Sequence, residues 1–411
     1  DINNALKVGA RGVTPHTHTG RWRDYLVVIE MGLSFALMIG AALMIRSVWQ
    51  LHRVELGFDP TNVLTMQFTI PPFKFNSDGK QTLASITTQK RAFIERVVER
   101  VKLLPGVVNA AAASSIPWRR DGHIASNIVG KPGQYSCRWR VASSDYFRTM
   151  GMPLLKGRAF TDQDTPQSGK VVIVNAEFVR KYFPEEEPLG TRLGTLGSAQ
   201  AEIIGVVADV RHNRFDQPME PAYYAPLSQE MSGVTYLVIR TNGDPLRHAG
   251  AVKSAVWAED KNQPLEEIAT LEEIKATTTS DSRFISSTLT VFASIALLLS
   301  TIGMYGVISY LVAQRKHEIG VRMALGAKQV DVAWLVLAKG MKLTLLAVAI
   351  SMTVTLWLTR LLKSLLFGVS ATDPPTFVAI AVLMMFVTII ACWIPVRRAA
   401  QVDPMIAIRY E

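Results

Sequence analysis

Residues 285–312 read ISSTLTVFASIALLLSTIGMYGVISYLV, a run of 28 residues without a charged side chain. A helix that crosses a membrane needs about 20 consecutive, mostly apolar residues. The run is long enough for this purpose, and we therefore predict a transmembrane helix at residues 284–314.

Three more apolar runs have the same character. Tyr25 to Ile45 contains one charge, at Glu30, whereas Leu343 to Thr359 and Phe377 to Val396 contain none. These runs predict three further transmembrane helices, at residues 25–50, 332–362 and 377–396.

The basic residues lie mostly beside the apolar runs. The chain has 411 residues, of which 49% are hydrophobic and 19% charged, and its formal net charge is +10. Cytoplasmic segments of membrane proteins carry an excess of Lys and Arg, and such residues gather before the first helix, between the second and third, and after the fourth: Arg21, Arg23, Arg315, Lys316, Arg322, Lys328, Arg397, Arg398 and Arg409. This pattern predicts cytoplasmic segments at 1–24, 315–331 and 397–411, and extracytoplasmic segments at 51–283 and 363–376. No basic stretch is interleaved with aromatic residues, so no nucleic-acid partner is expected.

Residues 51–283 have the pattern of a mixed α/β domain. Apolar residues recur at helical spacing from Thr88 to Leu104, and the order strand, helix, strand follows at 170–175, 176–184 and 201–210. We predict two small α/β lobes that divide near 135–145. The predicted fold class is an α-helical membrane protein with four transmembrane helices plus a large mixed α/β extracytoplasmic domain of two lobes inserted between helices 1 and 2.

The sequence contains no familiar catalytic or metal-binding motif. It lacks a G-x-x-x-x-G-K-[ST] phosphate loop, a G-x-S-x-G elbow and an H-E-x-x-H pair. The two cysteines, Cys137 and Cys392, fit no metal-ligand spacing. We therefore expect no catalytic residue, no metal, no cofactor and no enzymatic activity.

The segment RKHEIGVRMALGA at 315–327 directly follows the second apolar run. In a helix, Glu318 and Arg322 are four residues apart, in the favourable order for an ion pair, and Ile319 and Met323 share one face. Gly326 can end such a helix. An amphipathic element of this kind could dock a partner at the cytoplasmic face, or it could simply connect two transmembrane helices.

The same segment resembles the signature that follows helix two in the MacB/FtsX-type (type VII) ABC transporter permease family. The C-terminal stretch PVRRAAQVDPMIAIRYE resembles that family's ending, and VVIVNAEFVRKYFPEEEPLGTRL and AEIIGVVADVRHNRF resemble its MacB-like periplasmic core. The resemblance runs from about Trp22 to Glu411. It implies that 51–283 is a MacB-like periplasmic core domain and that the chain is a multi-pass protein of the bacterial inner membrane, with both termini in the cytoplasm.

The resemblance also implies a coupling role for the segment after helix two. In that family the segment contacts the nucleotide-binding subunit and transmits its motion, and the matching positions here are Glu318, Ile319, Gly320, Arg322, Ala324, Leu325, Gly326 and Ala327. The implied function is that of a permease subunit that transmits ATPase motion to the extracytoplasmic domain for export or mechanotransmission. Four spans leave little room for a wide pore within one protomer, so we expect a dimer, in contact with membrane lipid.

Two alternatives remain open. The opening stretch DINNALKVGARG resembles the linker before the second half of the duplicated orphan permeases of acidobacteria, which would make this chain part of a longer protein. A separate ATP-binding subunit would then be absent, and the chain would pair with a sister permease half and act as a membrane sensor or scaffold. The other alternative is an FtsX-like signalling subunit that regulates a cell-envelope hydrolase.

Three other features are candidates for functional side chains. Glu30 lies inside the first helix, and because a charge inside a membrane is costly, its carboxylate is a candidate functional group. The alternative is a structural carboxylate near the cytoplasmic end that pairs with a basic residue such as Arg23 or Lys339. The stretches WRR at 118–120 and CRWRV at 137–141 could contact a ligand or partner, or they could be ordinary surface and strand.

Overall fold

The computed structural model describes residues 16–52, 55–70, 82–119, 122–195, 200–212, 217–314, 319, 322, 328–361 and 366–400. These residues form two compact units. One lies within Asp1–Arg53 and Asp281–Glu411 and holds the long apolar helices, and the other lies within Val54–Ser280 and holds the strands.

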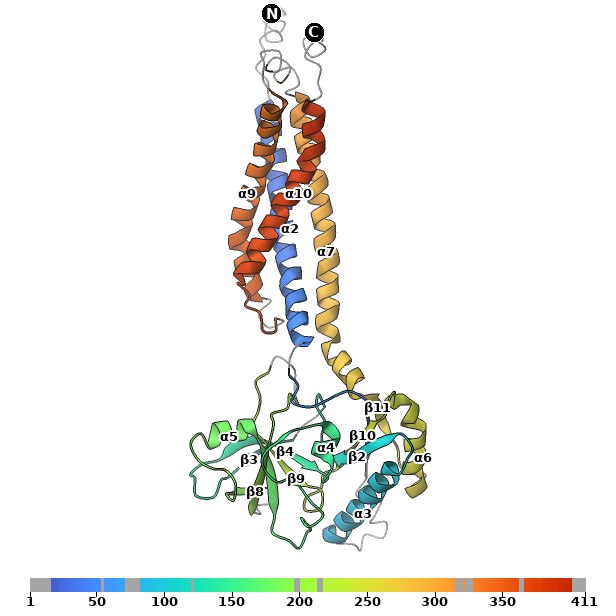
Figure 1. Cartoon of the computed structure of the whole chain (residues 1–411). Helices are drawn as coiled ribbons and strands as arrows, with labels where there is room; N and C mark the ends of the chain where they lie inside the picture. Colours follow the sequence, from blue (N-terminus) through green and yellow to red (C-terminus); the bar gives the residue numbers. More distant parts are fainter. Residues whose placement is uncertain are drawn as a thin grey trace, which may run out of the picture. The chain divides into compact units, whose positions relative to one another are not determined.

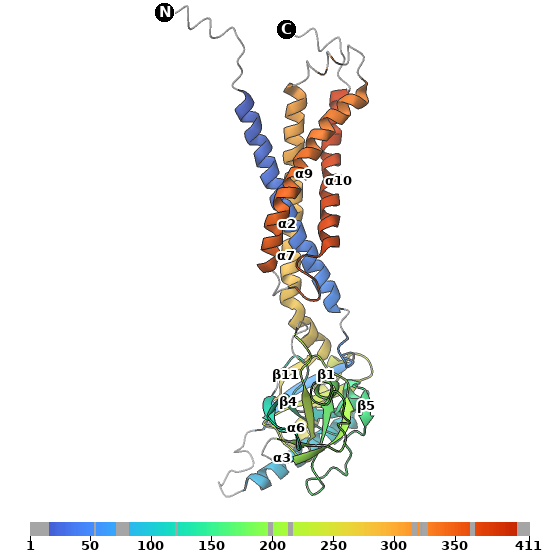
Figure 2. The same cartoon turned by 90° about the vertical axis from the view of Figure 1, so that its left-hand side faces the viewer.

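Four long helices dominate the first unit (Figure 1). They are α2 (His16–His52), α7 (Leu271–Gln314), α9 (Gln329–Leu361) and α10 (Pro374–Ala400), and they run alongside one another in a second view (Figure 2). Each contains a stretch long and apolar enough to cross a membrane: Trp22–Leu51, Arg283–Gln314, Val330–Arg360 and Pro374–Pro395. The four transmembrane helices predicted from the sequence are confirmed.

Helix α7 begins at Leu271, well before the predicted start at 284, because a capping box starts it. The Thr270 hydroxyl accepts a hydrogen bond from the Glu273 N–H at 3.0 Å, and the Glu273 carboxylate accepts one from the Thr270 N–H at 2.9 Å. This reciprocal pair satisfies two backbone donors at the start of the helix. The first turns of α7 are polar, so the apolar pattern alone did not reveal them.

Small and hydroxylated residues allow the long helices to approach closely. A Cβ added at Gly340 of α9 would come within 2.7 Å of the Cys392 sulfur on α10. The Thr344 and Thr388 hydroxyls form a hydrogen bond of 2.8 Å between the same two helices. Small residues and interhelical hydrogen bonds are typical of helix association in membranes, where burial of apolar surface alone gives little driving force.

An 11-stranded mixed sheet runs through the second unit. Its hydrogen-bonded order is β11-β1-β10-β2-β4-β9-β6-β8-β5, with β3 beside β4 and β7 beside β8. The strands are β1 (Val63–Thr69), β2 (Val107–Ala113), β3 (Gly122–Ser126), β4 (Tyr135–Ala142), β5 (Leu154–Gly157), β6 (Val171–Asn175), β7 (Arg192–Gly194), β8 (Gln200–Val207), β9 (Ala222–Pro226), β10 (Val234–Thr241) and β11 (Glu266–Thr270). The helices are α3 (Leu83–Lys102), α4 (Tyr146–Met150), α5 (Ala176–Tyr182), η2 (Pro245–His248) and α6 (Ala249–Glu259).

The first lobe is built on β1, β2, β10 and β11, with α3 and α6 side by side against it (Figure 1). Alternate residues of β1, among them Met66 and Phe68, pack with Ile94 and Val97 of α3 in one apolar core. The period of two in the strand and of about 3.6 in the helix brings these side chains together. The Thr82 hydroxyl caps α3 by accepting a hydrogen bond from the Ser85 N–H.

The second lobe contains β3 to β9 and has its own core. Val172 and Val174 of β6, Phe178 of α5 and Ile203 of β8 are buried together, and β6 runs parallel to β8. The strand, helix, strand order predicted at 170–210 is therefore confirmed.

The second lobe is inserted into the first. Strands β2 and β10 are antiparallel neighbours, with Ala113 opposite Tyr236, so the chain leaves the first lobe after β2 and returns to it at β10. The single division that we predicted near 135–145 is wrong. Those residues include β4, which joins the two parts of the sheet through the pair of Ala113 and Ala142. Local patterns could not show the return of β10, because its pairing with β2 depends on residues far apart in the sequence.

Candidate functional site

Two residues of the predicted coupling segment are described. Ile319 is 4% exposed and packs with Val312 of α7 and Val332 of α9. The Arg322 side chain is exposed. The other predicted coupling residues lie outside the described residues: Glu318, Gly320, Ala324, Leu325, Gly326 and Ala327. The coupling role of the segment therefore stays a prediction.

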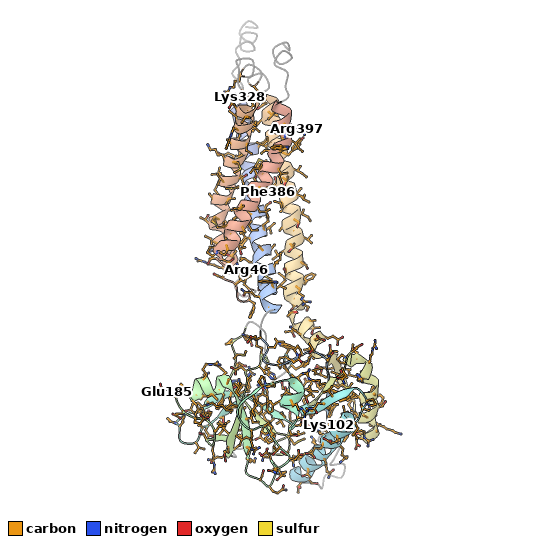
Figure 3. The ribbon with its side chains drawn as sticks, in the orientation of Figure 1. Arg46, Lys102, Glu185, Lys328, Phe386 and Arg397 are labelled. Atoms are coloured by element: carbon orange, nitrogen blue, oxygen red, sulfur yellow. The ribbon has the colours of Figure 1, made fainter. Side chains whose placement is uncertain are left out.

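Charged side chains mark both ends of the helix bundle (Figure 3). Lys328 and Arg397 lie at one end and Arg46 at the other, with the apolar side chain of Phe386 between them. This distribution is typical of membrane-spanning helices, whose charged residues lie at the level of the lipid headgroups.

Glu30 does not pair with either basic residue that the sequence suggested. The Lys339 Nζ atom pairs with Asp24 at 3.2 Å. The Arg23 guanidinium carbon lies 4.1 Å from the centre of the Tyr310 ring. Both basic side chains thus contact residues other than Glu30, and the structure does not support a pairing of Glu30 with Arg23 or Lys339.

Glu30 lies instead where α2 meets α7. A Cβ added at Gly303 of α7 would come within 2.7 Å of the Glu30 Oε2 atom, so the glycine leaves room for the carboxylate. One turn away, the Ser34 and Ser300 hydroxyls form a buried hydrogen bond of 2.7 Å, and Ser34 also donates to the Ala296 carbonyl at 2.9 Å. These contacts form a polar junction between the two helices that lead to the α/β unit.

A second polar junction lies at the other end of α2. The Arg46 guanidinium forms an ion pair with Asp373, and Asp373 accepts a hydrogen bond of 3.2 Å from the Thr376 N–H in the first turn of α10. The Ser47 hydroxyl accepts a hydrogen bond of 2.7 Å from the Phe367 N–H. The ion pair and these hydrogen bonds thus join the end of α2 to the segment that connects α9 with α10.

A cavity of about 450 Å³ lies beside the sheet of the first lobe. Arg119 of the WRR stretch and Trp139 of the CRWRV stretch both line it, so the structure brings these two predicted contact stretches together. Ser114, just before the WRR stretch, also lines the cavity, and other lining residues come from distant parts of the chain: Gln67, Ser232, Tyr236 and Glu267. The sequence analysis missed these residues because nothing next to them in the sequence marks them as neighbours of Arg119.

The cavity wall carries one basic and one acidic side chain in contact. The Arg119 Nε atom lies 2.9 Å from the Glu267 Oε2 atom. The Trp139 indole N–H donates to Glu230 at 2.6 Å, and burial raises the pKa of Glu230 above its usual range. The cavity wall therefore carries charges of both signs and an aromatic ring, rather than charges of a single sign.

The described residues provide no metal site, and burial keeps two side chains of catalytic type neutral. Among them, no group of three or more His, Cys, Asp and Glu side chains could hold a metal ion. Burial raises the pKa of the Cys137 thiol to about 12 and lowers the pKa of His212 well below its usual range. These two side chains are thus neutral at pH 7, and the Cys137 thiol is not in the thiolate form that acts as a nucleophile.

Four membrane-spanning helices, with an α/β domain between the first and the second, define a polytopic membrane protein that carries a large extracytoplasmic domain. Residues 28–258, more than half of the chain, match the MacB-like periplasmic core domain. Residues 290–404 match the FtsX-like permease C-terminal domain. The chain belongs to the MacB/FtsX-type permease family, as its motifs indicated.

Curated relatives are similar to this chain over about two thirds of its length. The macrolide export ATP-binding/permease protein MacB of Chromobacterium violaceum is 28% identical over 281 residues, which are 65% of this chain and 42% of that protein. The protein of the same name from Escherichia coli (strain K12) is 27% identical over 282 residues, 66% of this chain and 43% of that protein. The matched part is thus less than half of each relative.

Two solved structures are also similar. The periplasmic region of MacB from Actinobacillus actinomycetemcomitans matches with a TM-score of 0.38 and 17% identity, and the match covers 54% of this chain and 94% of that one. The extracellular domain of the noncanonic ABC-type transporter YknZ from Gram-positive bacteria matches with a TM-score of 0.32 and 18% identity, covering 48% of this chain and 94% of that one.

Proposed function

We propose that this chain is the permease component of a MacB/FtsX-like ABC system. A separate ATP-binding subunit would contact residues 315–327 in the cytoplasm and move the ends of α7 and α9. Helices α2 and α7 would pass this motion to the extracytoplasmic domain, for export or mechanotransmission. Membership of the family supports the permease role, and the curated relatives are named as combined ATP-binding/permease proteins.

The burial of Ile319 is the observation that carries the proposal. Its side chain is 4% exposed and packs in one apolar cluster with Val332 of α9 and Val312 of α7. A force applied to the segment at this point would reach both helices, because tightly packed side chains transmit displacement. Arg322 has an exposed side chain, as expected of a residue that contacts a separate subunit.

The charge distribution supports the proposed orientation. Lys328 and Arg397 lie at the same end of the bundle (Figure 3), and an excess of basic residues favours the cytoplasmic side. We therefore place both termini and 315–331 in the cytoplasm.

Helix α7 supports the proposed dimer and lipid contacts. Large apolar side chains on α7 are more than half exposed, among them Phe292 at 57% and Ile302 at 65%. Apolar side chains within a membrane-spanning helix contact lipid or another helix. A second copy, or a sister permease half, would cover part of this surface.

A pull-down from native membranes tests the coupling proposal. The full-length protein is compared with the double variant Glu318→Ala plus Arg322→Ala, and co-purifying proteins are identified by mass spectrometry and assayed for ATPase activity. The charge-matched control Lys181→Ala plus Glu185→Ala changes two exposed residues of the α/β unit. An ATPase should co-purify with the wild type and the control and be lost from the coupling variant.

The opposite results are equally informative. If no ATPase co-purifies with correctly folded wild-type protein, the coupling role is rejected and a sensor or scaffold role takes its place. Co-purification of a cell-envelope hydrolase would favour the signalling role.

A further inference from the structure

The cavity beside the first lobe lies on the face of the sheet that α3 does not cover. Gln67 and Tyr236 are opposite each other in the ladder of β1 and β10, and both line the cavity. Their sequence neighbours Met66 and Leu237 are buried in the core that includes α3. Because successive strand residues point to opposite faces, this part of the sheet has one apolar face under the helix and one face that holds the cavity.

Two unusual backbone positions hold the charged side chains at the cavity wall. Glu267 has a φ of 48°, and Trp118, directly before Arg119, has a φ of 63°. Left-handed backbone is unfavourable for residues other than Gly, Asn and Asp. The ion pair between Arg119 and Glu267 is part-exposed, with side chains 31% and 41% exposed, and such pairs add little stability. Local structure accommodates both conformations: Glu267 lies at the irregularity in the pairing of β1 with β11, and the Trp118 N–H donates to the His212 carbonyl at 2.6 Å. The observation that points to a ligand is therefore the placement of two opposite charges, of little value to stability, on the wall of one cavity.

We propose that this cavity binds a small zwitterionic ligand, an amino acid or a short peptide with free ends. The ligand's carboxylate would pair with Arg119 and its ammonium group with Glu267. A ligand of a single charge would separate the two side chains and leave one of them without its partner. A zwitterion satisfies both, because its carboxylate matches the planar guanidinium and its ammonium matches the carboxylate.

The remaining wall fits the rest of such a ligand. The Trp139 ring lies against Gly122, where a Cβ would come within 3.0 Å of it, and its N–H is engaged by Glu230. The ring is thereby fixed in place and, with Tyr236, can contact an apolar side chain of the ligand. Gln67 and Ser232 supply amide and hydroxyl groups for the ligand backbone. The volume of about 450 Å³ lies within the usual range for small-molecule sites, about 300–1,000 Å³.

Isothermal titration calorimetry on the full-length protein in detergent tests the proposal. The probes are phenylalanine and the tripeptide Gly-Phe-Gly, both with free ends, and the same tripeptide with an acetylated N-terminus and an amidated C-terminus. At least one free-ended probe should bind, and comparison of the two shows which ligand size the cavity takes. The blocked tripeptide should bind at least about tenfold more weakly, which corresponds to a loss of about 1.4 kcal/mol.

Variants separate a binding role from a structural one. Glycine adopts positive φ without strain, so Glu267→Gly should keep or raise the thermal midpoint while it weakens binding of the free-ended probe by about tenfold or more. Arg119→Gln should weaken binding similarly. Glu266→Gln, at the exposed neighbouring position, is the matched control and should bind like the wild type.

Three outcomes would overturn the proposal. They are no binding of either free-ended probe to folded protein at millimolar concentration, equal binding of the blocked tripeptide, and unchanged binding in Glu267→Gly. The last outcome, together with a lower thermal midpoint, would assign Glu267 a purely structural role.

Discussion

Replacing Asn175 with alanine should destabilise the second lobe more than a typical surface substitution. Asn175 is 4% exposed and forms four hydrogen bonds. Its Oδ1 atom accepts from the Phe178 N–H at 3.1 Å and from the Ala222 N–H at 2.8 Å. Its Nδ2 atom donates to Asp209 at 2.8 Å and to the Glu220 carbonyl at 3.0 Å. One side chain therefore caps α5 and joins β6 to β9.

The magnitude follows from the two backbone donors that lose their acceptor. Loss of an N-cap side chain costs about 1 kcal/mol. The Ala222 N–H belongs to a fully buried residue, and a buried donor without a partner costs about 1–3 kcal/mol. We expect a total of about 3 kcal/mol for Asn175→Ala, which corresponds to about a 100-fold change in the equilibrium constant for local opening.

Hydrogen–deuterium exchange with mass spectrometry measures this opening in the full-length protein. Peptides from β6 and β9 should exchange about 100-fold faster in Asn175→Ala. Asn175→Asp keeps the helix cap and the side-chain shape but places an oxygen against the Asp209 carboxylate. Its loss of stability should therefore be at least as large as that of Asn175→Ala. Asn262→Ala, at an exposed position, is the control and should change stability by less than about 0.5 kcal/mol. Unchanged protection of β6 and β9 in Asn175→Ala would refute the reasoning.

Other substitutions test the helix bundle, the α7 cap and an ion pair. Gly303→Leu should lower the thermal midpoint of the detergent-solubilised protein, because even a Cβ at Gly303 would lie 2.7 Å from the Glu30 carboxylate. Gly306 faces open space, so the control Gly306→Leu should change the thermal midpoint much less. Thr270→Ala should cost about 1 kcal/mol at the start of α7 and speed hydrogen exchange in its first turn; unchanged exchange would contradict the capping box. Hydrogen bonding from Arg158 holds the pKa of Asp164 below its usual range. The ionised Asp164 carboxylate therefore stabilises the fold above pH about 4, and this stabilisation is lost as the pH falls through the lowered pKa. In denaturant unfolding, Asp164→Asn should therefore be less stable at neutral pH and show a weaker loss in acid, and an unchanged pH profile would count against this role.

The sequence predicted the features that depend on local pattern. The apolar runs revealed all four long helices, because a membrane span requires a continuous run that few other structures contain. The strand, helix, strand unit at 170–210 was also predictable, because β6, α5 and β8 follow one another in the chain. The start of α7 was missed although Thr270 and Glu273 have the spacing of a capping box.

The candidate cavity could be predicted only in part. The stretches around Arg119 and Trp139 were singled out by their composition. Nothing in either stretch indicates that both line one cavity with Glu267, since the contact arises only after β10 and β11 return to the first lobe. The backbone conformation of Glu267 was equally invisible, because a glutamate gives no sequence signal for positive φ.

The insertion of the second lobe has a consequence for how such proteins diversify. Ala113 and Tyr236 are paired residues on neighbouring antiparallel strands, so their Cα atoms are about 5 Å apart. In the first lobe, β2 and β10 therefore form a hairpin whose loop is an entire lobe. A gene segment that encodes this loop can be exchanged, lengthened or shortened while β11, β1, β10 and β2 keep their order, since insertions whose ends lie close together are readily accommodated. Recombination at these two positions would produce permeases that keep the same membrane helices and first lobe but present a different outer surface.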